Sequence, residues 1–318
     1  MTGPVAAVDC GTNSLRLLIA DPGPEPGTLR ERVRTVEIVR LGQGVDATGE
    51  FRAEALERTF AVLDDYAARI AAAGIDPGRI GFVATSAARE VTNRDAFFAG
   101  VRSRLDVVPE IVSGRQEAEL SFTGALSSAA VRARIGGREP VLVMDIGGGS
   151  TELILGRSGS PPDGVVSMET GSVRLTERFL RSSPSTPRQR REAIAQIDRL
   201  IDGSGLDLAG ARSWVGVAGT VTTLAALHTG RTDPARLHAS VVPQPALAGL
   251  AARLAQRSAG QIQADTGMHP GRADVITAGA MIAAAIGRRL SVDRLVVSVT
   301  DILDGIALRL LADGRIAR

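Results

Sequence analysis

A pattern that occurs twice in the chain places the strongest constraint on the fold. The apolar run Val5–Asp9 ends in an aspartate and is followed by the turn-forming stretch Cys10–Ser14 and a second apolar run. The same order returns 136 residues later, where Val141–Asp145 is followed by a glycine-rich turn and another apolar run. Two apolar runs joined by a tight turn are typical of a β-hairpin. The repetition therefore predicts two similar halves that each begin with a hairpin.

The segments that follow these hairpins alternate between strand and helix patterns. In the first half we expect strands at Leu15–Ala20, Arg30–Arg40, Arg79–Thr85 and Val107–Val112, and helices at Phe51–Ala73, Ala87–Leu105 and Gly114–Arg134, the last one broken at Gly124. In the second half we expect strands at Leu153–Leu155, Gly164–Glu169, Trp214–Val217 and Val292–Val299, and helices at Ser172–Leu180, Pro187–Leu200 and Asp301–Leu311. Strands joined by crossover helices in both halves predict a duplicated α/β architecture.

The basic residues exclude several kinds of chemistry. All 37 of them are arginine, and the 318-residue chain contains no lysine. The chain therefore has no lysine for a Walker-A phosphate loop, a protein-kinase site, a pyridoxal Schiff base or an aldolase. A single cysteine, Cys10, and three histidines provide no disulfide framework and little for a metal centre built on sulfur or imidazole ligands.

Other properties of the sequence limit the partners and the location that the protein can have. Aromatic residues make up 3% of the chain, which argues against nucleic-acid binding by base stacking. No run approaches the ~20 apolar residues of a membrane span, and the N-terminus lacks the basic and apolar regions of a secretion signal. We therefore expect a cytoplasmic protein with no membrane or nucleic-acid partner.

Three glycine-containing turns point to phosphate binding. They lie at Asp9–Ser14, Asp145–Thr151 and Gly216–Thr223, and each follows an apolar strand. Glycine lets the backbone approach a ligand closely, and successive N–H groups in such a turn form an anion-binding nest. Serine and threonine hydroxyls add further donors, and an aspartate at the strand end is suited to hold Mg²⁺ beside phosphate oxygens.

Three longer strings resemble one family of phosphatases. They are Ala84–Asn93 (ATSAAREVTN), Ile111–Leu120 (IVSGRQEAEL) and Met144–Leu153 (MDIGGGSTEL). With the glycine turns, they resemble the exopolyphosphatase and guanosine pentaphosphate phosphatase family, a branch of the acetate kinase, heat-shock chaperone ATPase and actin superfamily. The resemblance extends from about Val5 to Leu311, with looser matches at Gly271–Met281 and Ser298–Gly305, and is to the short form of the family.

The resemblance implies a particular fold and domain organisation. It implies a duplicated actin-like, or ribonuclease H-like, α/β fold of two domains with a cleft between them. The domains are expected at residues 1–127 and 128–300, and the helix at 301–318 is expected to pack back on the first domain. The resemblance also implies a homodimer.

The same resemblance implies roles for individual residues. Glu117 matches the family's catalytic carboxylate, which orients or deprotonates the attacking water. Asp145 and Glu152 match an acidic pair for Mg²⁺, and Asp9, their counterpart in the first half, is expected to reach the metal through water. The phosphate-binding residues expected from the resemblance are Thr12, Asn13, Ser14, Arg16, Arg89, Asn93, Gly147, Gly148, Gly149, Ser150, Gly219 and Thr220. Arg89 and Asn93 are expected one helical turn apart.

The activity implied by the resemblance is Mg²⁺-dependent hydrolysis of the terminal phosphoanhydride of inorganic polyphosphate, which releases orthophosphate. Hydrolysis of guanosine pentaphosphate is the alternative within the family, and the scarcity of aromatic residues for a guanine pocket favours polyphosphate. From another class, a sensor that binds polyphosphate or a nucleotide without hydrolysis is the competing hypothesis. The presence of Glu117, Asp145 and Glu152 argues against such a sensor. A sugar kinase of the same superfamily would need an adenosine pocket and a sugar-binding insertion.

Three positions depart from the family's pattern. Gln116 stands where many relatives carry a second glutamate, and Glu119 stands where a basic residue is frequent. Ile302–Gly305 (ILDG) replaces the more usual Leu-Arg-Glu-Gly. These departures concern the surroundings of Glu117 and the start of the C-terminal helix.

Overall fold

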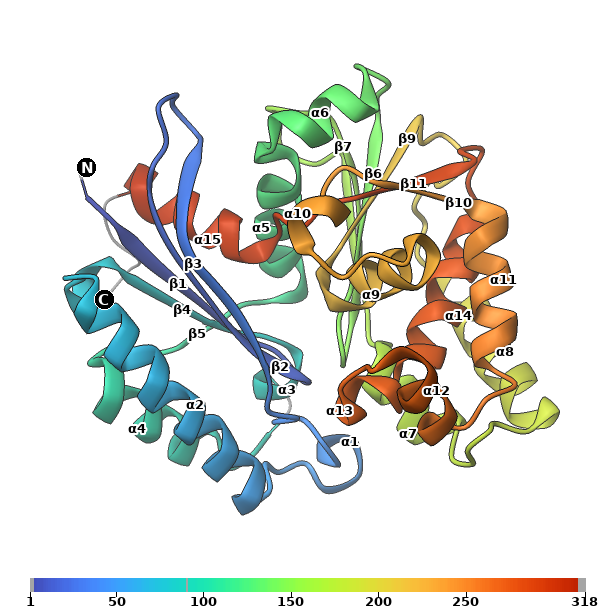
Figure 1. The fold of residues 1–318 in the computed structure, drawn as a ribbon, viewed down its shortest axis with the longest axis horizontal. Helices are drawn as coiled ribbons and strands as arrows, with labels where there is room; N and C mark the ends of the chain where they lie inside the picture. Colours follow the sequence, from blue (N-terminus) through green and yellow to red (C-terminus); the bar gives the residue numbers. More distant parts are fainter. Residues whose placement is uncertain (1–2, 90, 314–318) are drawn as a thin grey trace. The chain divides into compact units, whose positions relative to one another are not determined.

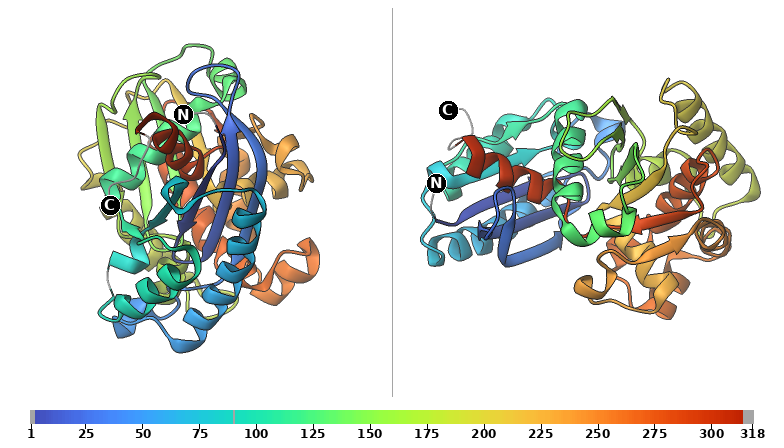
Figure 2. Two further views of the ribbon diagram at one scale, coloured as in Figure 1. Left: turned by 90° about the vertical axis from the view of Figure 1, so that its left-hand side faces the viewer. Right: turned by 90° about the horizontal axis from the view of Figure 1, so that it is seen from above.

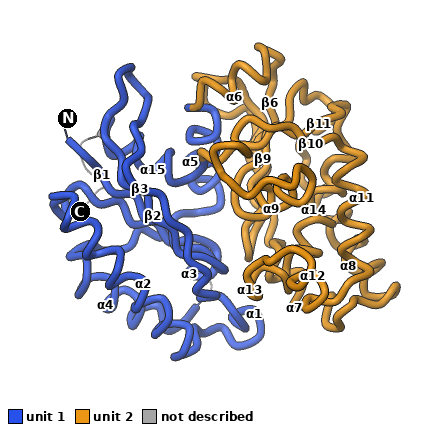
Figure 3. Tube along the Cα trace, viewed as in Figure 1, with its two compact units in different colours: residues 1–127, 301–318 blue, residues 128–300 orange. Residues whose placement is uncertain are grey.

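The computed structural model describes residues 3–89 and 91–313 of the chain. The chain forms two compact units, one made of residues 1–127 and 301–318 and the other of residues 128–300 (Figure 3). Of the helix expected at 301–318, residues 314–318 lie outside the described residues, and the described helix, α15, covers Ile302–Asp313. Among the residues that the structure describes, no helix is long and apolar enough to cross a membrane.

The first unit is built on a five-stranded sheet in the order β3-β2-β1-β4-β5 (Figure 1). Its strands are β1 (Val5–Cys10), β2 (Ser14–Pro22), β3 (Leu29–Ile38), β4 (Ile80–Ala84) and β5 (Glu110–Ile111). The first three strands form an antiparallel meander, and β4 and β5 run parallel to β1. Parallel neighbours require a crossover connection, which explains why helices intervene only after β3.

Helices cover both faces of this sheet (Figure 1). They are α1 (Val45–Thr48), α2 (Ala53–Ala72), the 3₁₀ turn η1 (Pro77–Arg79), α3 (Ser86–Arg89), α4 (Arg94–Leu105), α5 (Gly114–Ser127) and α15. Because alternate residues of a strand point to opposite faces, Ala6 and Val8 of β1 join a core with α2 and α4, whereas Val5 and Ala7 join one with α5 and α15. The same alternation assigns Asp9 to the face covered by α5 and α15.

The second unit repeats this sheet order with one added strand. Its strands are β6 (Val141–Ile146), β7 (Thr151–Gly156), β8 (Gly164–Met168), β9 (Ser213–Val217), β10 (Val241–Pro243) and β11 (Arg294–Val297). The order β8-β7-β6-β9-β11 reproduces β3-β2-β1-β4-β5, with the same antiparallel and parallel pairs, and β10 extends the edge. This correspondence confirms the predicted duplicated α/β fold, and the shared order is that of a ribonuclease H-like sheet.

The second unit has a mostly helical cover and a large apolar core. Its helices are α6 (Ala129–Ile135), α7 (Ser172–Phe179), α8 (Pro187–Asp202), α9 (Ala218–Thr229), α10 (Pro234–Leu237), α11 (Gln244–Leu254), α12 (Ala259–Thr266), α13 (Pro270–Ala273) and α14 (Ile276–Gly287). α14 is apolar on all sides and buried along almost its whole length, as expected of a helix at the centre of a core. Trp214 of β9 is wholly buried in the same core.

The helix expected at Gly114–Arg134 is divided at a different residue from the one we predicted. α5 continues through Gly124 without interruption and ends at Ser127, and Ser128 caps α6 by accepting a hydrogen bond from the N–H of Val131. Gly124 is required for packing instead, since a Cβ there would lie 1.7 Å from the carbonyl oxygen of Asp301. A Cβ on Gly305 of α15 would likewise lie 2.1 Å from the carbonyl oxygen of Leu120, so the two helices touch backbone to backbone (Figure 2).

The single helix expected at Ala87–Leu105 is also corrected. The structure has two helices there, α3 and α4, and Asn93 is the residue that precedes α4. Asn93 does not have helical backbone angles, and its side chain binds another segment of the chain. Arg89 and Asn93 therefore do not lie one turn apart on a common helix.

Candidate active site

The two hairpin turns have matching geometry. In the first unit the N–H of Gly11 donates to the carbonyl of Ser14 over 3.0 Å, and in the second the N–H of Gly147 donates to the carbonyl of Ser150 over 3.1 Å. The strand registers also match, because Asp9 lies opposite Arg16 and Asp145 lies opposite Glu152. The two units thus present an equivalent turn with different charges beside it.

Each turn is held by its carbonyl groups. The N–H of Gly42 donates to the carbonyl of Thr12 over 2.8 Å, and the N–H of Val173 in α7 donates to that of Gly148 over 2.8 Å. Among the described residues, the backbone N–H groups of Thr12, Gly148 and Gly149 have no hydrogen-bond partner. Such amides at the tip of a turn are the donors of an anion-binding nest. The structure therefore leaves available the groups that phosphate binding at these turns requires.

Glycine is needed beside the second turn as well as in it. A Cβ on Gly171, which precedes α7, would lie 2.5 Å from the carbonyl of Gly148. Ser150 is buried, and the nearby Thr151 hydroxyl donates to the carbonyl of Thr170. The turn Gly147–Ser150 is consequently packed tightly against the start of α7, which fixes its position on the sheet.

In the first unit, Asp9 belongs to a buried network of charges. Nε and Nη2 of Arg16 donate to Oδ2 of Asp9 over 2.8 and 2.6 Å, and Nη1 of Arg16 binds Asp301 at the start of α15. Arg34 of β3 donates to both carboxylate oxygens of Asp304 over 2.9 Å. Arg16 is thus held by two carboxylates, and its predicted contact with phosphate stays a prediction.

Burial shifts the acidity of several groups around this network. Burial raises the pKa of Asp9, although the Arg16 charge opposes the shift. Burial also raises the pKa of Asp304 from 3.8 to about 6, against the opposing charge of Arg34. The pKa of the Cys10 thiol lies well above its usual value for the same reason, so this thiol remains protonated near neutral pH.

In the second unit, two carboxylates lie opposite each other across the hairpin. Asp145 and Glu152 are 5% and 0% exposed, and the hydroxyl of Ser167 in β8 donates to Oε1 of Glu152 over 2.7 Å. Side chains directly opposite on one face of an antiparallel pair have Cβ atoms only about 5 Å apart. Two hard oxygen donors at this spacing suit Mg²⁺, which proteins usually hold with one or two carboxylates, waters and substrate phosphates.

The metal ligands would come from few protein groups. Within the described ranges, no group of three or more histidine, cysteine, aspartate or glutamate side chains is arranged to hold a metal ion. In the same part of the chain, the buried Oδ1 atom of Asp9 has no hydrogen-bond partner. An oxygen in that condition can accept a hydrogen bond from a bound water, and the indirect metal role expected for Asp9 stays a prediction.

The third glycine motif is a strand-to-helix junction. β9 ends at Val217, and Gly219 and Thr220 lie in the first turn of α9. Nη1 of Arg272 donates to the hydroxyl of Thr223 over 3.0 Å, and this guanidinium lies 3.4 Å from where a Cβ of Gly219 would be. The positive end of a helix and an arginine together favour an anion at this junction.

The predicted catalytic carboxylate is joined to a predicted phosphate-binding arginine. Nη1 of Arg89 donates to Oε2 of Glu117 over 2.8 Å and to the carbonyl of Val112 over 2.9 Å. Glu117 is buried in the first turn of α5, whereas Arg89 retains some exposure. Nε and Nη2 of Arg89 make no hydrogen bond to any described residue. One edge of this guanidinium is therefore available to a ligand.

Asn93 has a different position from the one that we expected. Its Oδ1 accepts from the N–H of Phe51 and its Nδ2 donates to the carbonyl of Phe51, both over 2.9 Å. This pair of bonds fixes the segment before α2 to the segment between α3 and α4. A direct contact of Asn93 with phosphate stays a prediction.

Several residues of the site did not emerge from the sequence. Asp301, Asp304 and Arg34 hold the Asp9 hairpin, but 285 residues separate Arg16 from Asp301. Arg174 is 5% exposed in the first turn of α7, beside the glycine turn, and Arg272 lies beside Gly219. Arg174 is one of 37 basic residues and its burial is not visible in composition, whereas Arg272 lies within the loosely matching stretch Gly271–Met281, which could have identified it.

The fold and these turns define a class of protein: a duplicated ribonuclease H-like α/β protein with an equivalent glycine-containing turn in each unit and an acidic pair beside the second turn. Within that class, residues 25–313 match the model of the Ppx/GppA phosphatase family. The chain belongs to this family.

Relatives of known name agree with this assignment. The chain is 45% identical to exopolyphosphatase 2 of Mycobacterium tuberculosis over 96% of this chain and 98% of that protein. The crystal structure of an exopolyphosphatase-like protein is 37% identical, covers 98% of this chain and 99% of its own, and has a TM-score of 0.87. A Ppx/GppA family member from Aquifex aeolicus is 26% identical over the full length of both chains, with a TM-score of 0.80.

Proposed function

We propose that this protein is an Mg²⁺-dependent exopolyphosphatase that hydrolyses the terminal phosphoanhydride of inorganic polyphosphate and releases orthophosphate. The family membership and the similarity to an exopolyphosphatase support the reaction class. The observation that carries the mechanism is the bond between Arg89 and Glu117. It joins a carboxylate to a guanidinium whose Nε and Nη2 groups bind no other described residue.

Arg89 has two tasks in this proposal. Its Nη1 holds Glu117 and the carbonyl of Val112, and its free Nε and Nη2 form the fork that binds two oxygens of one phosphate. A phosphate held at that edge lies next to the Glu117 carboxylate. Glu117 then orients the attacking water or accepts its proton as the water approaches the phosphorus.

The second unit supplies the acidic pair. Asp145 and Glu152 would hold Mg²⁺, with the remaining ligands coming from water and substrate oxygens. When bound, the ion neutralises charge on the phosphate oxygens. The free amides of Thr12, Gly148 and Gly149 and the start of α9 are the proposed sites for further phosphate oxygens.

The decisive experiment measures orthophosphate release with Mg²⁺ from short polyphosphate, long polyphosphate and guanosine pentaphosphate. Glu117→Gln keeps the shape of the side chain and its bond to Arg89, but removes the base. We expect kcat to fall by about 10²–10⁴-fold, with little change in KM. The ranking of the three substrates decides between the polyphosphate and the guanosine pentaphosphate activity.

Glu119→Gln is the matched control, because Glu119 lies on the same helix and its partly exposed carboxylate pairs with the exposed Arg115. We expect its kinetics to stay close to those of the unmodified protein. If the unmodified protein binds polyphosphate but releases no phosphate from any of the three substrates, the protein is a sensor and the proposal is wrong. Light scattering would test the homodimer that we predict, and cell fractionation would test the cytoplasmic location.

A further inference from the structure

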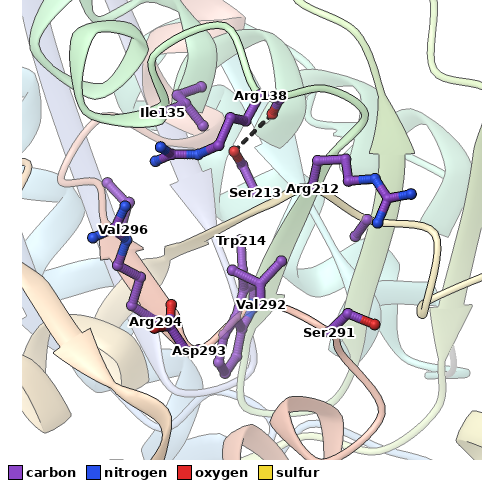
Figure 4. Close-up of a pocket in the computed structure, with 11 residues that line it drawn as sticks. Ile135, Arg138, Arg212, Ser213, Trp214, Ser291, Val292, Asp293, Arg294 and Val296 are labelled. Atoms are coloured by element: carbon purple, nitrogen blue, oxygen red, sulfur yellow. Dashed lines mark hydrogen bonds between the residues drawn. The ribbon is translucent and has the colours of Figure 1, made fainter.

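The second unit contains a pocket that is remote from the Gly147–Ser150 turn of the same unit. It has a volume of about 270 Å³ and is lined by the segments that precede β6, β9 and β11 and by residues of β9 and β11 themselves (Figure 4). These are the amino ends of three neighbouring strands, whereas the Gly147–Ser150 turn follows the carboxyl end of β6. With six residues in β6, the two places are roughly 17–20 Å apart. The pocket is therefore not part of the site described above.

Three arginine side chains contribute to the pocket lining. Arg138, Arg212 and Arg294 all line it, and within the part of the chain that the structure describes none of them forms an ion pair. Only Arg138 has a side-chain hydrogen bond, a long one of 3.4 Å to the carbonyl of Arg134. Asp293 is the one acidic residue in the lining, which leaves an excess of two positive charges.

Other features of the pocket also suit an anion. Figure 4 shows Arg138 and Arg294 on one side of the pocket and Arg212 on the other, with Trp214 between them. Trp214 is wholly buried, and its indole N–H has no hydrogen-bond partner among the described residues. A ligand in the pocket would not reach this buried indole, but as part of the lining the indole can report binding. The guanidinium groups of Arg138 and Arg294, on the same side of one small pocket, match an anion with more than one phosphate group.

We propose that this pocket is a second binding site for short oligophosphates, separate from the catalytic turns. Guanidinium groups also bind carboxylates, so the choice of phosphate rests on the proposed function. In open α/β sheets, ligands usually bind at the carboxyl ends of the strands. A site at the amino ends therefore holds an oligophosphate away from Asp145 and Glu152 of the same unit.

Trp214 makes the proposal directly measurable, because it is the only tryptophan in the chain. We would titrate the full-length protein with inorganic tripolyphosphate in EDTA, which prevents Mg²⁺-dependent turnover, and record tryptophan fluorescence. We expect a saturable change in emission. In Arg138→Ala/Arg294→Ala the affinity should fall by at least about tenfold, since each substitution removes a charge-assisted contact. Both residues are exposed, so the variant keeps its core.

Arg231→Ala is the control, because Arg231 is exposed, belongs to the same unit and lies outside the pocket lining. Its titration should match that of the unmodified protein. Equilibrium dialysis with labelled tripolyphosphate gives a second readout: two sites per chain are expected, falling to one in Arg138→Ala/Arg294→Ala. An unchanged number of sites in that variant, or equal saturation by citrate, would overturn the proposal.

The binding test is independent of catalysis. Glu117→Gln should retain the fluorescence change, because Glu117 is not part of the pocket. If the protein releases no phosphate but the fluorescence change persists, the proposed function is wrong and the proposal of a second binding site still stands. If hydrolysis proceeds and pocket substitutions alter neither readout, only the pocket proposal fails.

Discussion

At the scale of single residues, the two hairpins differ in one partner. Asp9 faces Arg16, and Asp145 faces Glu152, at equivalent positions of equivalent strands. In the first unit the aspartate is neutralised within the protein by an arginine. In the second the opposite carboxylate increases the negative charge and favours a cation. The residue opposite the aspartate is thus what distinguishes the two hairpins. Arginine neutralises the first one within the protein, whereas glutamate makes the second one suited to a metal.

The acid beside the first hairpin predicts a pH dependence of stability. The pKa of Asp304 is raised from 3.8 to about 6, so the folded protein binds this proton more tightly than the unfolded chain does. The stabilisation by this group is complete below pH 3.8 and is lost as the pH rises through 6. Asp304→Asn imitates the protonated acid. Relative to that variant, the free energy of unfolding of the unmodified protein should fall by on the order of 2–3 kcal/mol as the pH rises across this range.

Urea unfolding between pH 3.5 and 7, at intervals of about half a unit, measures this difference. Asp163→Asn, which removes an exposed carboxylate of the other unit, should leave the pH profile of the free energy unchanged. Parallel profiles for the unmodified protein and Asp304→Asn would show that Asp304 titrates near its ordinary value.

At the scale of elements, α5 and α15 are locked together by two glycines. Gly124 of α5 faces the carbonyl of Asp301, which immediately precedes α15, and Gly305 of α15 faces the carbonyl of Leu120 in α5, so neither glycine has room for a side chain. Arg309 of α15 also binds Glu110 of β5, with one N–O distance of 2.6 Å. Since α5 begins with Gly114 and carries Glu117 in its first turn, this packing fixes the helix that presents the proposed base.

Gly124→Ala should therefore be strongly destabilising. The added Cβ would meet the carbonyl oxygen of Asp301 at 1.7 Å, and backbone atoms cannot move aside as a flexible side chain can. We expect a loss of more than about 3 kcal/mol in the free energy of unfolding, measured by urea denaturation. Gly78→Ala is the control, because a Cβ at Gly78 meets nothing within 4 Å. Equal stability of the two variants would contradict the backbone contact.

At the scale of the whole molecule, the proposed reaction requires groups from both units: Glu117 and Arg89 from the first, Asp145 and Glu152 from the second. Removal of Mg²⁺ with EDTA should abolish phosphate release, and added Mg²⁺ should restore it. In Glu152→Gln, the Mg²⁺ concentration that gives half-maximal activity should rise at least about tenfold, because a charged ligand is replaced by a neutral one. Asp163→Asn should need no more Mg²⁺ than the unmodified protein. Activity that survives EDTA would contradict the metal requirement.

The sequence predicted local features well and distant contacts poorly. The hairpins at Asp9 and Asp145 were predictable because strand, turn and strand are adjacent in the chain. The break between α3 and α4 was not, because it depends on Asn93 binding Phe51, 42 residues away. Gly124 was misinterpreted as a helix breaker because the carbonyl that requires it belongs to Asp301. Roles of single residues, such as Glu117, came from resemblance and not from physical pattern.

The division of the first unit has a consequence for the order of events during synthesis. The second unit is one continuous segment, residues 128–300, inserted between the two parts of the first. One face of the first sheet, with Val5, Ala7 and Leu18, is covered by Ile302, Ile306 and other residues of α15. The ribosome makes these covering residues after the whole of the second unit. The first unit therefore completes one of its two apolar cores only when α15 has emerged, and until then the nascent chain exposes a β-sheet face that other chains can bind.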